Sequence, residues 1–204
     1  MSTGRLEAFS DGVLAIIITV MVLELKVPGE PYSLSTLWQD SGLGLLTYVL
    51  SFVYVGIYWN NHHHLFQLCD KINGAVLWAN LSLLFSLSLY PFTTAWMDES
   101  RLARTPVVVY GVNLLMAATA YFFLQHFMAR VPGQGDRMRE VFGRTVKEIA
   151  SLGLYMLGIA LAFVTPWLGL VPFALVAITW LVPDRRVERY LEAQGEGTGE
   201  ILEA

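Results

Sequence analysis

Two clusters of polar residues in the first third of the chain could do chemistry. One is Ser10-Asp11, which follows Arg5 and Phe9 and stands directly before an apolar run. The other is His62-His63-His64, which follows Trp59 closely. Aspartate and histidine can relay protons or attract cations, and a run of histidines raises the question of a metal site.

The histidine run does not fit a metal centre. Adjacent residues of a helix point about 100° apart, so the three rings cannot all reach one ion. The positions four residues after them hold Phe66, Gln67 and Leu68, so none has a cysteine or acidic partner there. We therefore predict no metal site, and a structural role with some pH sensitivity for these histidines.

The composition of the chain is that of a protein in lipid. Hydrophobic residues make up 55% of it and charged residues 15%. In soluble domains the apolar share averages about 45–50% and the charged share about 25%. The net charge of -4 and the lack of a basic block outside the loop near Arg137 argue against a nucleic-acid partner. The single cysteine, Cys69, excludes a disulfide within the chain. Enzyme motifs such as GxSxG, HExxH or a phosphate loop do not occur, so we expect no enzyme and no cofactor.

Uncharged stretches predict an all-α integral membrane protein with six transmembrane helices. The stretches are residues 12–23, 41–61, 72–97, 106–129 and 149–183, and the last divides at Thr165-Pro166 into a hairpin. When the spans alternate in direction, only three of the 13 Lys and Arg residues lie on one side of the membrane, Lys26, Arg101 and Arg104, and the other ten lie on the opposite side. The positive-inside rule therefore places both termini in the cytoplasm, with the protein in the cell membrane. Residues 1–184 form the transmembrane domain, and residues 185–204 a partly disordered cytoplasmic tail.

The first span has charged ends that must be held. Its uncharged part covers about 18 Å of helix, less than the hydrocarbon core of about 30 Å. Protein or water must therefore hold the charged residues at its ends, as in a bundle around an aqueous path. Ile16, Val20 and Leu23 form one stripe, with Thr19 beside it. The plainer interpretation is that this stripe packs against a neighbouring helix or lipid.

The polar residues near the first helix are best explained as scaffold. We expect Arg5 and Asp11 to form a buried pair, with hydrogen bonds from Ser10 and His62. Alternatively, Asp11 attracts cations at a pore mouth. In the middle of later spans, Asn80 and Asn113 are expected to make hydrogen bonds between helices.

These residues resemble a known signature. Arg5-x-x-x-Phe9-Ser10-Asp11, followed by a helix rich in Ile, Leu and Val, is similar to the motif of the TMEM175 family. Vertebrate members of this family are potassium channels of endosomes and lysosomes. The single copy of the motif resembles the bacterial members, which are homotetramers with a pore lined by four first helices. The resemblance therefore implies a homotetramer in membrane lipid, with K⁺ as the permeant ion and a pore-lining first helix.

Carried onto this chain, the resemblance assigns roles to individual residues. Ile16, Val20 and Leu23 would form stacked hydrophobic rings that make the pore constriction and gate. Thr19 would favour potassium over sodium. A structural network would tie the first helix to its neighbours, through Arg5, Phe9, Ser10, Asp11, Trp59 and His62.

The function expected from these observations is a modestly potassium-selective cation channel gated by hydrophobic rings. The sequence has no TVGYG-type carbonyl filter, so selectivity must arise in another way. One alternative is a proton-conducting channel or secondary transporter that uses Asp11 and His62 as a relay. Another is a structural membrane protein whose first helix simply packs.

Overall fold

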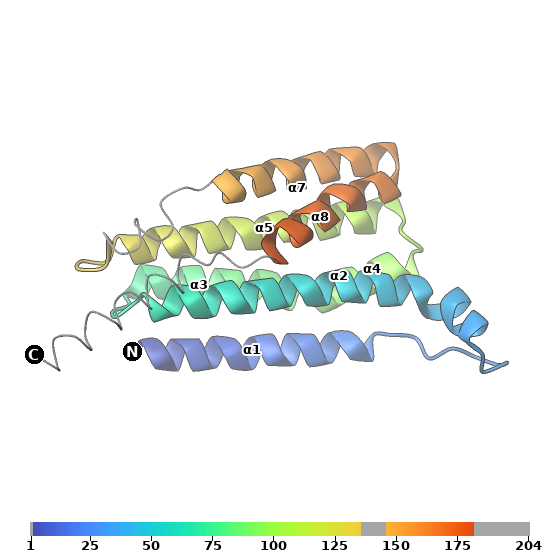
Figure 1. The fold of residues 1–204 in the computed structure, drawn as a ribbon, viewed down its shortest axis with the longest axis horizontal. Coiled ribbons are helices and arrows are strands. Elements are labelled where there is room, and N and C mark those ends of the chain that lie inside the picture. Colours follow the sequence, from blue (N-terminus) through green and yellow to red (C-terminus); the bar gives the residue numbers. More distant parts are fainter. Residues whose placement is uncertain (1, 136–145, 182–204) are drawn as a thin grey trace, which may run out of the picture.

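The fold consists of long helices that run nearly side by side (Figure 1). The computed structural model describes residues 2–135 and 146–181, and these ranges contain helices and no strand. The helices are α1 (Thr3–Leu23), α2 (Leu34–Gln67), α3 (Gly74–Ser88), α4 (Tyr90–Glu99), α5 (Arg104–Ala129), α7 (Val146–Val164) and α8 (Pro166–Leu181). The predicted all-α membrane class is confirmed.

The described helices form six rods when α3 and α4 are taken as one interrupted rod. α1, α2, the rod 74–99, α5 and α7 are each long and apolar enough to cross a membrane, whereas α8 is apolar but shorter, at 16 residues. Successive rods run in opposite directions (Figure 1). The hairpin predicted at Thr165-Pro166 is confirmed, because α7 ends at Val164 and α8 begins at Pro166.

The first helix is longer than its uncharged part. It begins at Thr3 and has 21 residues, which is about 31 Å at about 1.5 Å per residue. Arg5, Glu7 and Asp11 therefore lie on its first turns, instead of in a loop before it. The helix can cross the membrane provided that these charged groups find partners.

Helix ends follow local chemistry. The Ser33 hydroxyl accepts a hydrogen bond from the Thr36 amide at the start of α2, and the Asn73 side chain accepts one from the Val76 amide at the start of α3. Pro91 lies in the first turn of α4 and has no N–H to donate. The third rod is consequently interrupted at Leu89, between α3 and α4.

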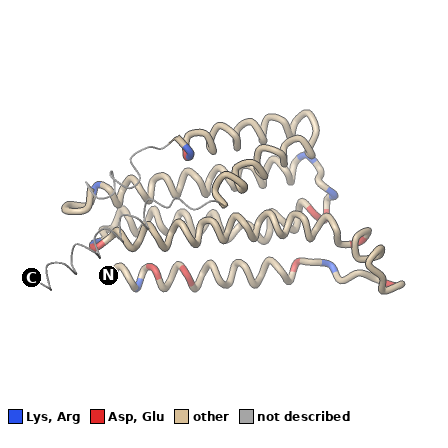
Figure 2. Tube along the Cα trace, viewed as in Figure 1, with Lys and Arg blue, Asp and Glu red and all other residues tan. Residues whose placement is uncertain are grey.

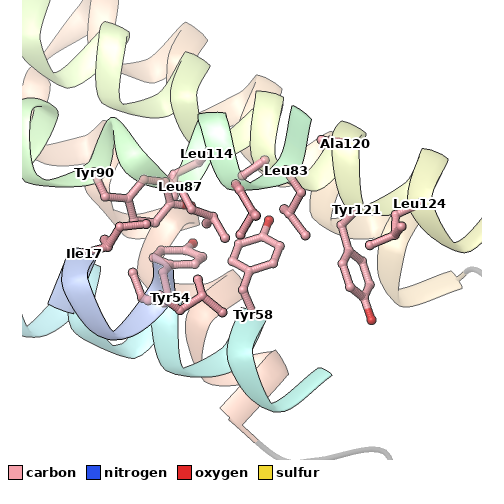
Figure 3. Close-up of a cluster of buried hydrophobic side chains, with 14 of the residues drawn as sticks. Ile17, Tyr54, Tyr58, Leu83, Leu87, Tyr90, Leu114, Ala120, Tyr121 and Leu124 are labelled. Atoms are coloured by element: carbon pink, nitrogen blue, oxygen red, sulfur yellow. The ribbon is translucent and has the colours of Figure 1, made fainter. Parts of the chain in front are cut away.

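Large buried side chains hold the bundle together. Figure 3 shows Tyr54 and Tyr58 of α2 among leucines of α3 and α5, with Ile17 of α1 and Tyr90 at the edge of the cluster. The Phe173 ring of α8 packs onto Gly158 of α7 and Gly111 of α5, where a Cβ would collide with it. Small residues thus let α5, α7 and α8 approach closely.

Charged residues gather at the two ends of the bundle (Figure 2). At the end where α1 and α7 begin and α2 and α5 finish, the basic residues of the described ranges are Arg5, Lys71, Arg130 and Lys147. The opposite end carries Lys26, Arg101 and Arg104. The other residues behind the predicted positive-inside bias lie outside the described ranges: Arg137, Arg139, Arg144, Arg185, Arg186 and Arg189. The predicted tail, 185–204, also lies outside them.

Candidate functional site

The first helix has two unlike faces. One face is packed against α2, α3 and α4, and its buried residues are Leu6, Ser10, Leu14, Ile17 and Met21. The other face is left uncovered by its own chain. There Ile16 is 63% exposed, Val20 37% and Leu23 79%. The predicted stripe therefore lies on a single open face of α1.

Polar and small residues share that open face. Arg5, Gly12 and Thr19 are seven residues apart, so they line up along a helix with 3.6 residues per turn. Ile16 and Leu23 lie four residues beyond Gly12 and Thr19 on the same stripe. All five are exposed in one chain. A stripe that mixes an arginine, a hydroxyl and apolar side chains is unusual for a surface facing only lipid.

The Thr19 hydroxyl is oriented by its own helix. It donates its proton to the carbonyl oxygens of Ala15, at 3.1 Å, and Ile16, at 2.9 Å. Since the proton is held by the backbone, the oxygen lone pairs remain available to an outside group. This geometry suits an acceptor for a cation better than a donor.

The packed face of α1 is tied to two helices by a directional chain of hydrogen bonds. Asn80 of α3 donates to the Ser10 hydroxyl, at 2.9 Å, and Ser10 donates to the Leu6 carbonyl, at 2.9 Å. The Asn80 carbonyl oxygen is thus left to accept from His62 Nε2 of α2, at 2.8 Å. His62 therefore carries its proton on Nε2, and its buried Nδ1 has no hydrogen-bond partner. The predicted interhelical role of Asn80 is confirmed.

His62 is also fixed by packing. Its ring stacks on Phe66 one turn along α2, with ring centroids 4.3 Å apart. The Asn80 amide cannot reorient without losing either the Ser10 bond or the His62 bond. The second predicted polar bridge, at Asn113, donates to Thr93 of α4 at 3.4 Å and so also joins two helices.

Two acids of α1 bind to α2. Glu7 accepts from His63 Nδ1, at 2.9 Å, and the other ring nitrogen of His63 faces Gln67, at 2.8 Å. Asp11 accepts from the Trp59 indole N–H, at 3.1 Å. These contacts explain how charged residues are held on the first turns of a membrane helix.

Within a single chain, Arg5 and Asp11 do not form the predicted ion pair, so this prediction is wrong. Arg5 is exposed and makes no ion pair with any described residue, and Asp11 is bound by Trp59 instead. Phe9 is likewise turned to the open face, 52% exposed. The reason is helical geometry, because Arg5 and Asp11 are six residues apart and project from different sides of α1.

The pair formed by Glu7 and His63 was not predicted from the sequence. A signal was present, since an acid on the first turn of a membrane helix requires a partner, but no spacing rule connects residues 56 positions apart. Across residues 2–135 and 146–181, three or more His, Cys, Asp or Glu residues never gather in a geometry that could hold a metal ion.

Comparisons with known proteins identify the family. Residues 5–91 match the family model described as the endosomal/lysosomal potassium channel TMEM175. The potassium channel HX13_20290 of Chryseobacterium sp. is 52% identical over 192 residues, which cover 94% of this chain and 99% of that protein. The chain belongs to the TMEM175 family. This is a family of ion channels and not of enzymes, and the predicted resemblance is confirmed.

The fold agrees with that of a solved TMEM175 relative. The crystal structure of a lysosomal potassium-selective channel TMEM175 homolog from Chamaesiphon minutus matches with a TM-score of 0.75 and 34% identity, covering 89% of this chain and 97% of that chain. The human relative is named endosomal/lysosomal proton channel TMEM175. It is 38% identical over 117 residues, which cover 52% of this chain but only 23% of that protein. Within the TMEM175 family, this chain is therefore a multi-pass membrane protein that corresponds in length to the bacterial relatives.

Proposed function

We propose that the protein is a potassium channel in which four copies surround a pore lined by α1. The observation that carries the proposal is the open face of α1, where Ile16, Thr19 and Leu23 are exposed although the opposite face is fully packed. Relatives named as potassium channels over most of the chain length support the ion. The protein's principal partner is then itself, in membrane lipid, with both termini on the cytoplasmic side of the cell membrane.

The gate is proposed to consist of rings of Ile16, Val20 and Leu23. Four apolar side chains that meet across an axis leave a passage too narrow and too dry for a hydrated ion. Ions then cross only when the rings widen enough for part of the hydration shell to remain. The spacing of four and three residues puts the rings about 6 Å and about 4.5 Å apart along the axis.

Thr19 is proposed to supply the preference for potassium. Its hydroxyl proton is donated to the backbone, so four Thr19 oxygens would face the axis as acceptors between the rings of Ile16 and Val20. Such oxygens replace part of the water that an ion sheds, which costs less for potassium than for the more strongly hydrated sodium. Because one hydroxyl ring offers few ligands, selectivity is expected to be modest.

The hydrogen-bond network is proposed to act as the scaffold of this pore. His62, Asn80 and Ser10 hold the packed face of α1, and Asp11 and Glu7 are held from its flank by α2. Rigid attachment at the cytoplasmic end keeps the stripe aimed at the axis. Arg5 and Phe9, on the open face, would then meet neighbouring copies near the cytoplasmic mouth.

Proton conduction is the second candidate function, because the human relative is named as a proton channel. A relay through Asp11 and His62 receives little support from the contacts, since Asp11 binds Trp59 and His62 binds Asn80, in separate hydrogen bonds. Protons would more simply use the same axial path as potassium. Currents carried in a proton gradient without potassium would identify this activity.

The proposed function is tested by a matched pair of substitutions. Ile16 on α1 is 63% exposed and Ile178 on α8 is 61% exposed, so replacement by Asn alters surfaces of equal accessibility. In liposomes with potassium inside and sodium outside, Ile16→Asn is expected to raise the potassium flux several-fold, because a polar ring holds water. Ile178→Asn is expected to leave it unchanged.

The outcome that would refute the pore assignment is equally specific. If Ile16→Asn and Ile178→Asn have the same flux as the unmodified protein, then α1 does not form the constriction. A sizing measurement in mild detergent provides the control for assembly. A mass of a single chain for the unmodified protein would contradict the proposed tetramer.

A further inference from the structure

A cavity lies in the bundle on the side of α2 away from α1. It is enclosed by α2, α5, α7 and α8, near the ends of α2 and α5, and α1 contributes nothing to its wall. Its volume is about 40 Å³, roughly three times what one water molecule needs. Half of the residues in the wall are aromatic, namely Tyr54, Tyr58, Tyr121, Phe122, Tyr155 and Trp180.

Glu148, on the first turn of α7, is the charged residue in this wall. Its Oε2 is buried and has no hydrogen-bond partner. A buried carboxylate oxygen without a donor is costly, so in a native structure it calls for an explanation.

The Gln125 side chain interacts with the Glu148 carboxyl, and the other neighbouring polar groups are engaged elsewhere. Ser151 accepts a hydrogen bond from the Trp180 indole, at 2.8 Å, and donates to the Lys147 carbonyl, at 2.7 Å. The Tyr121 hydroxyl donates to the Asn61 carbonyl, at 3.1 Å. The Lys147 ammonium lies over the Trp180 ring, 5.7 Å from its centre, and makes no ion pair with Glu148.

Tyrosine rings shape the floor of the cavity. Tyr58 and Tyr121 meet edge to face with ring centroids 5.9 Å apart (Figure 3), and Tyr54 packs on Tyr155 at 6.3 Å. The Tyr54 hydroxyl is bound to the Phe173 carbonyl, at 2.6 Å. The rings are thus fixed by packing, and their faces and edges are the surface that an occupant would meet.

The chemistry of this wall selects one class of ligand. A bare metal cation requires several oxygen ligands. The wall offers one carboxylate, and the Ser151 and Tyr121 hydroxyls beside it are already engaged in hydrogen bonds. A small organic ammonium ion fits both the carboxylate and the aromatic rings of the wall. The carboxylate attracts its positive charge and accepts from its N–H groups, and the aromatic faces attract its polarised methyl groups. We propose that the cavity beside Glu148 is a binding site for a small organic ammonium ion of the size of methylammonium or trimethylammonium.

Binding is tested by thermal unfolding of the purified full chain in mild detergent. A ligand that binds only the folded protein raises the unfolding midpoint in a saturable way. We expect trimethylammonium chloride to raise the midpoint relative to sodium chloride at equal ionic strength. Its uncharged counterpart of similar shape, tert-butanol, should give no saturable rise. No current is measured, so the result does not depend on the pore proposal.

Three variants assign the effect to the cavity. Glu148→Gln keeps the shape and should weaken trimethylammonium binding at least tenfold, and Ala118→Phe should abolish binding by filling the space from the α5 wall. Glu99→Gln removes an exposed acid from the opposite end of the bundle and should bind as the unmodified protein does. Equal midpoint shifts in Glu148→Gln and the unmodified protein, or equal shifts with tert-butanol, would overturn the proposal. So would the absence of any saturable shift with either methylammonium or trimethylammonium.

Discussion

Replacement of Asn80 by Ala gives the sharpest test of how α1 is held. It removes two buried side-chain hydrogen bonds, to Ser10 at 2.9 Å and to His62 at 2.8 Å. Such bonds contribute about 0.6 kcal/mol each on average in a membrane protein and about 1 kcal/mol in water. The substitution also leaves the His62 N–H buried without an acceptor, at about 1–3 kcal/mol. Together these terms predict a loss of about 2–5 kcal/mol in the free energy of unfolding.

The loss can be measured by reversible unfolding with SDS in mixed micelles. Ser82→Ala is the matched control on α3, because Ser82 is exposed and donates only to the Trp78 carbonyl of its own helix. It should change the free energy by less than about 0.5 kcal/mol. A double-mutant cycle of Asn80→Ala with Ser10→Ala should give a coupling of about 0.6–1 kcal/mol. An Asn80→Ala loss no larger than that of Ser82→Ala would refute the reasoning.

Three further predictions address selectivity, helix packing and the thiol. Thr19→Ala removes the only hydroxyl on the stripe formed with Ile16, Val20 and Leu23, so it should lower the preference for potassium over sodium. Reversal potentials under bi-ionic conditions measure this preference. An unchanged potassium-to-sodium permeability ratio would exclude Thr19 as the selecting group. Gly158→Ala drives a methyl group into the Phe173 ring and should lower the free energy of unfolding by about 1–3 kcal/mol. Gly153→Ala on the same helix meets open space and should raise it by up to about 1 kcal/mol. Equal changes in the free energy of unfolding would contradict the packing of Phe173 on Gly158. Burial raises the pKa of the Cys69 thiol. At about pH 8.5 a free cysteine is half ionised, so maleimide should label the folded protein much more slowly than the protein unfolded in SDS. Equal labelling rates would disprove the burial of Cys69.

Much of the fold could be predicted because it depends on patterns that are local along the chain. Uncharged runs located the membrane rods, and Thr165-Pro166 located the turn of the last hairpin, because proline cannot continue the preceding helix. The interruption at Leu89 was not predicted, although Pro91 was visible. In lipid, an apolar run can tolerate such a break when neighbouring helices cover it, so composition alone does not distinguish one helix from two.

The candidate site was predictable in part. The stripe of Ile16, Val20 and Leu23 follows from helical periodicity, and the structure leaves these residues on one open face. The partners of the charged residues could not be predicted in this way. Asp11 was expected to bind Arg5, but it accepts a hydrogen bond from Trp59, on another helix. Periodicity places residues around one helix and carries no information on which neighbour lies opposite.

The sequence by itself determined that this chain lives in a membrane as antiparallel helices, and that one motif places it among the TMEM175 proteins. The first conclusion rests on the free energy of transferring each side chain from water to lipid, and the second on the identity of the motif residues. Both are properties of the individual residues and do not depend on how the helices pack. Only the tertiary structure decided that Asn80 joins Ser10 to His62, that Glu7 meets His63, and that Glu148 borders an aromatic cavity. These contacts join residues from different helices, and their existence depends on the rotation and depth at which the helices pack.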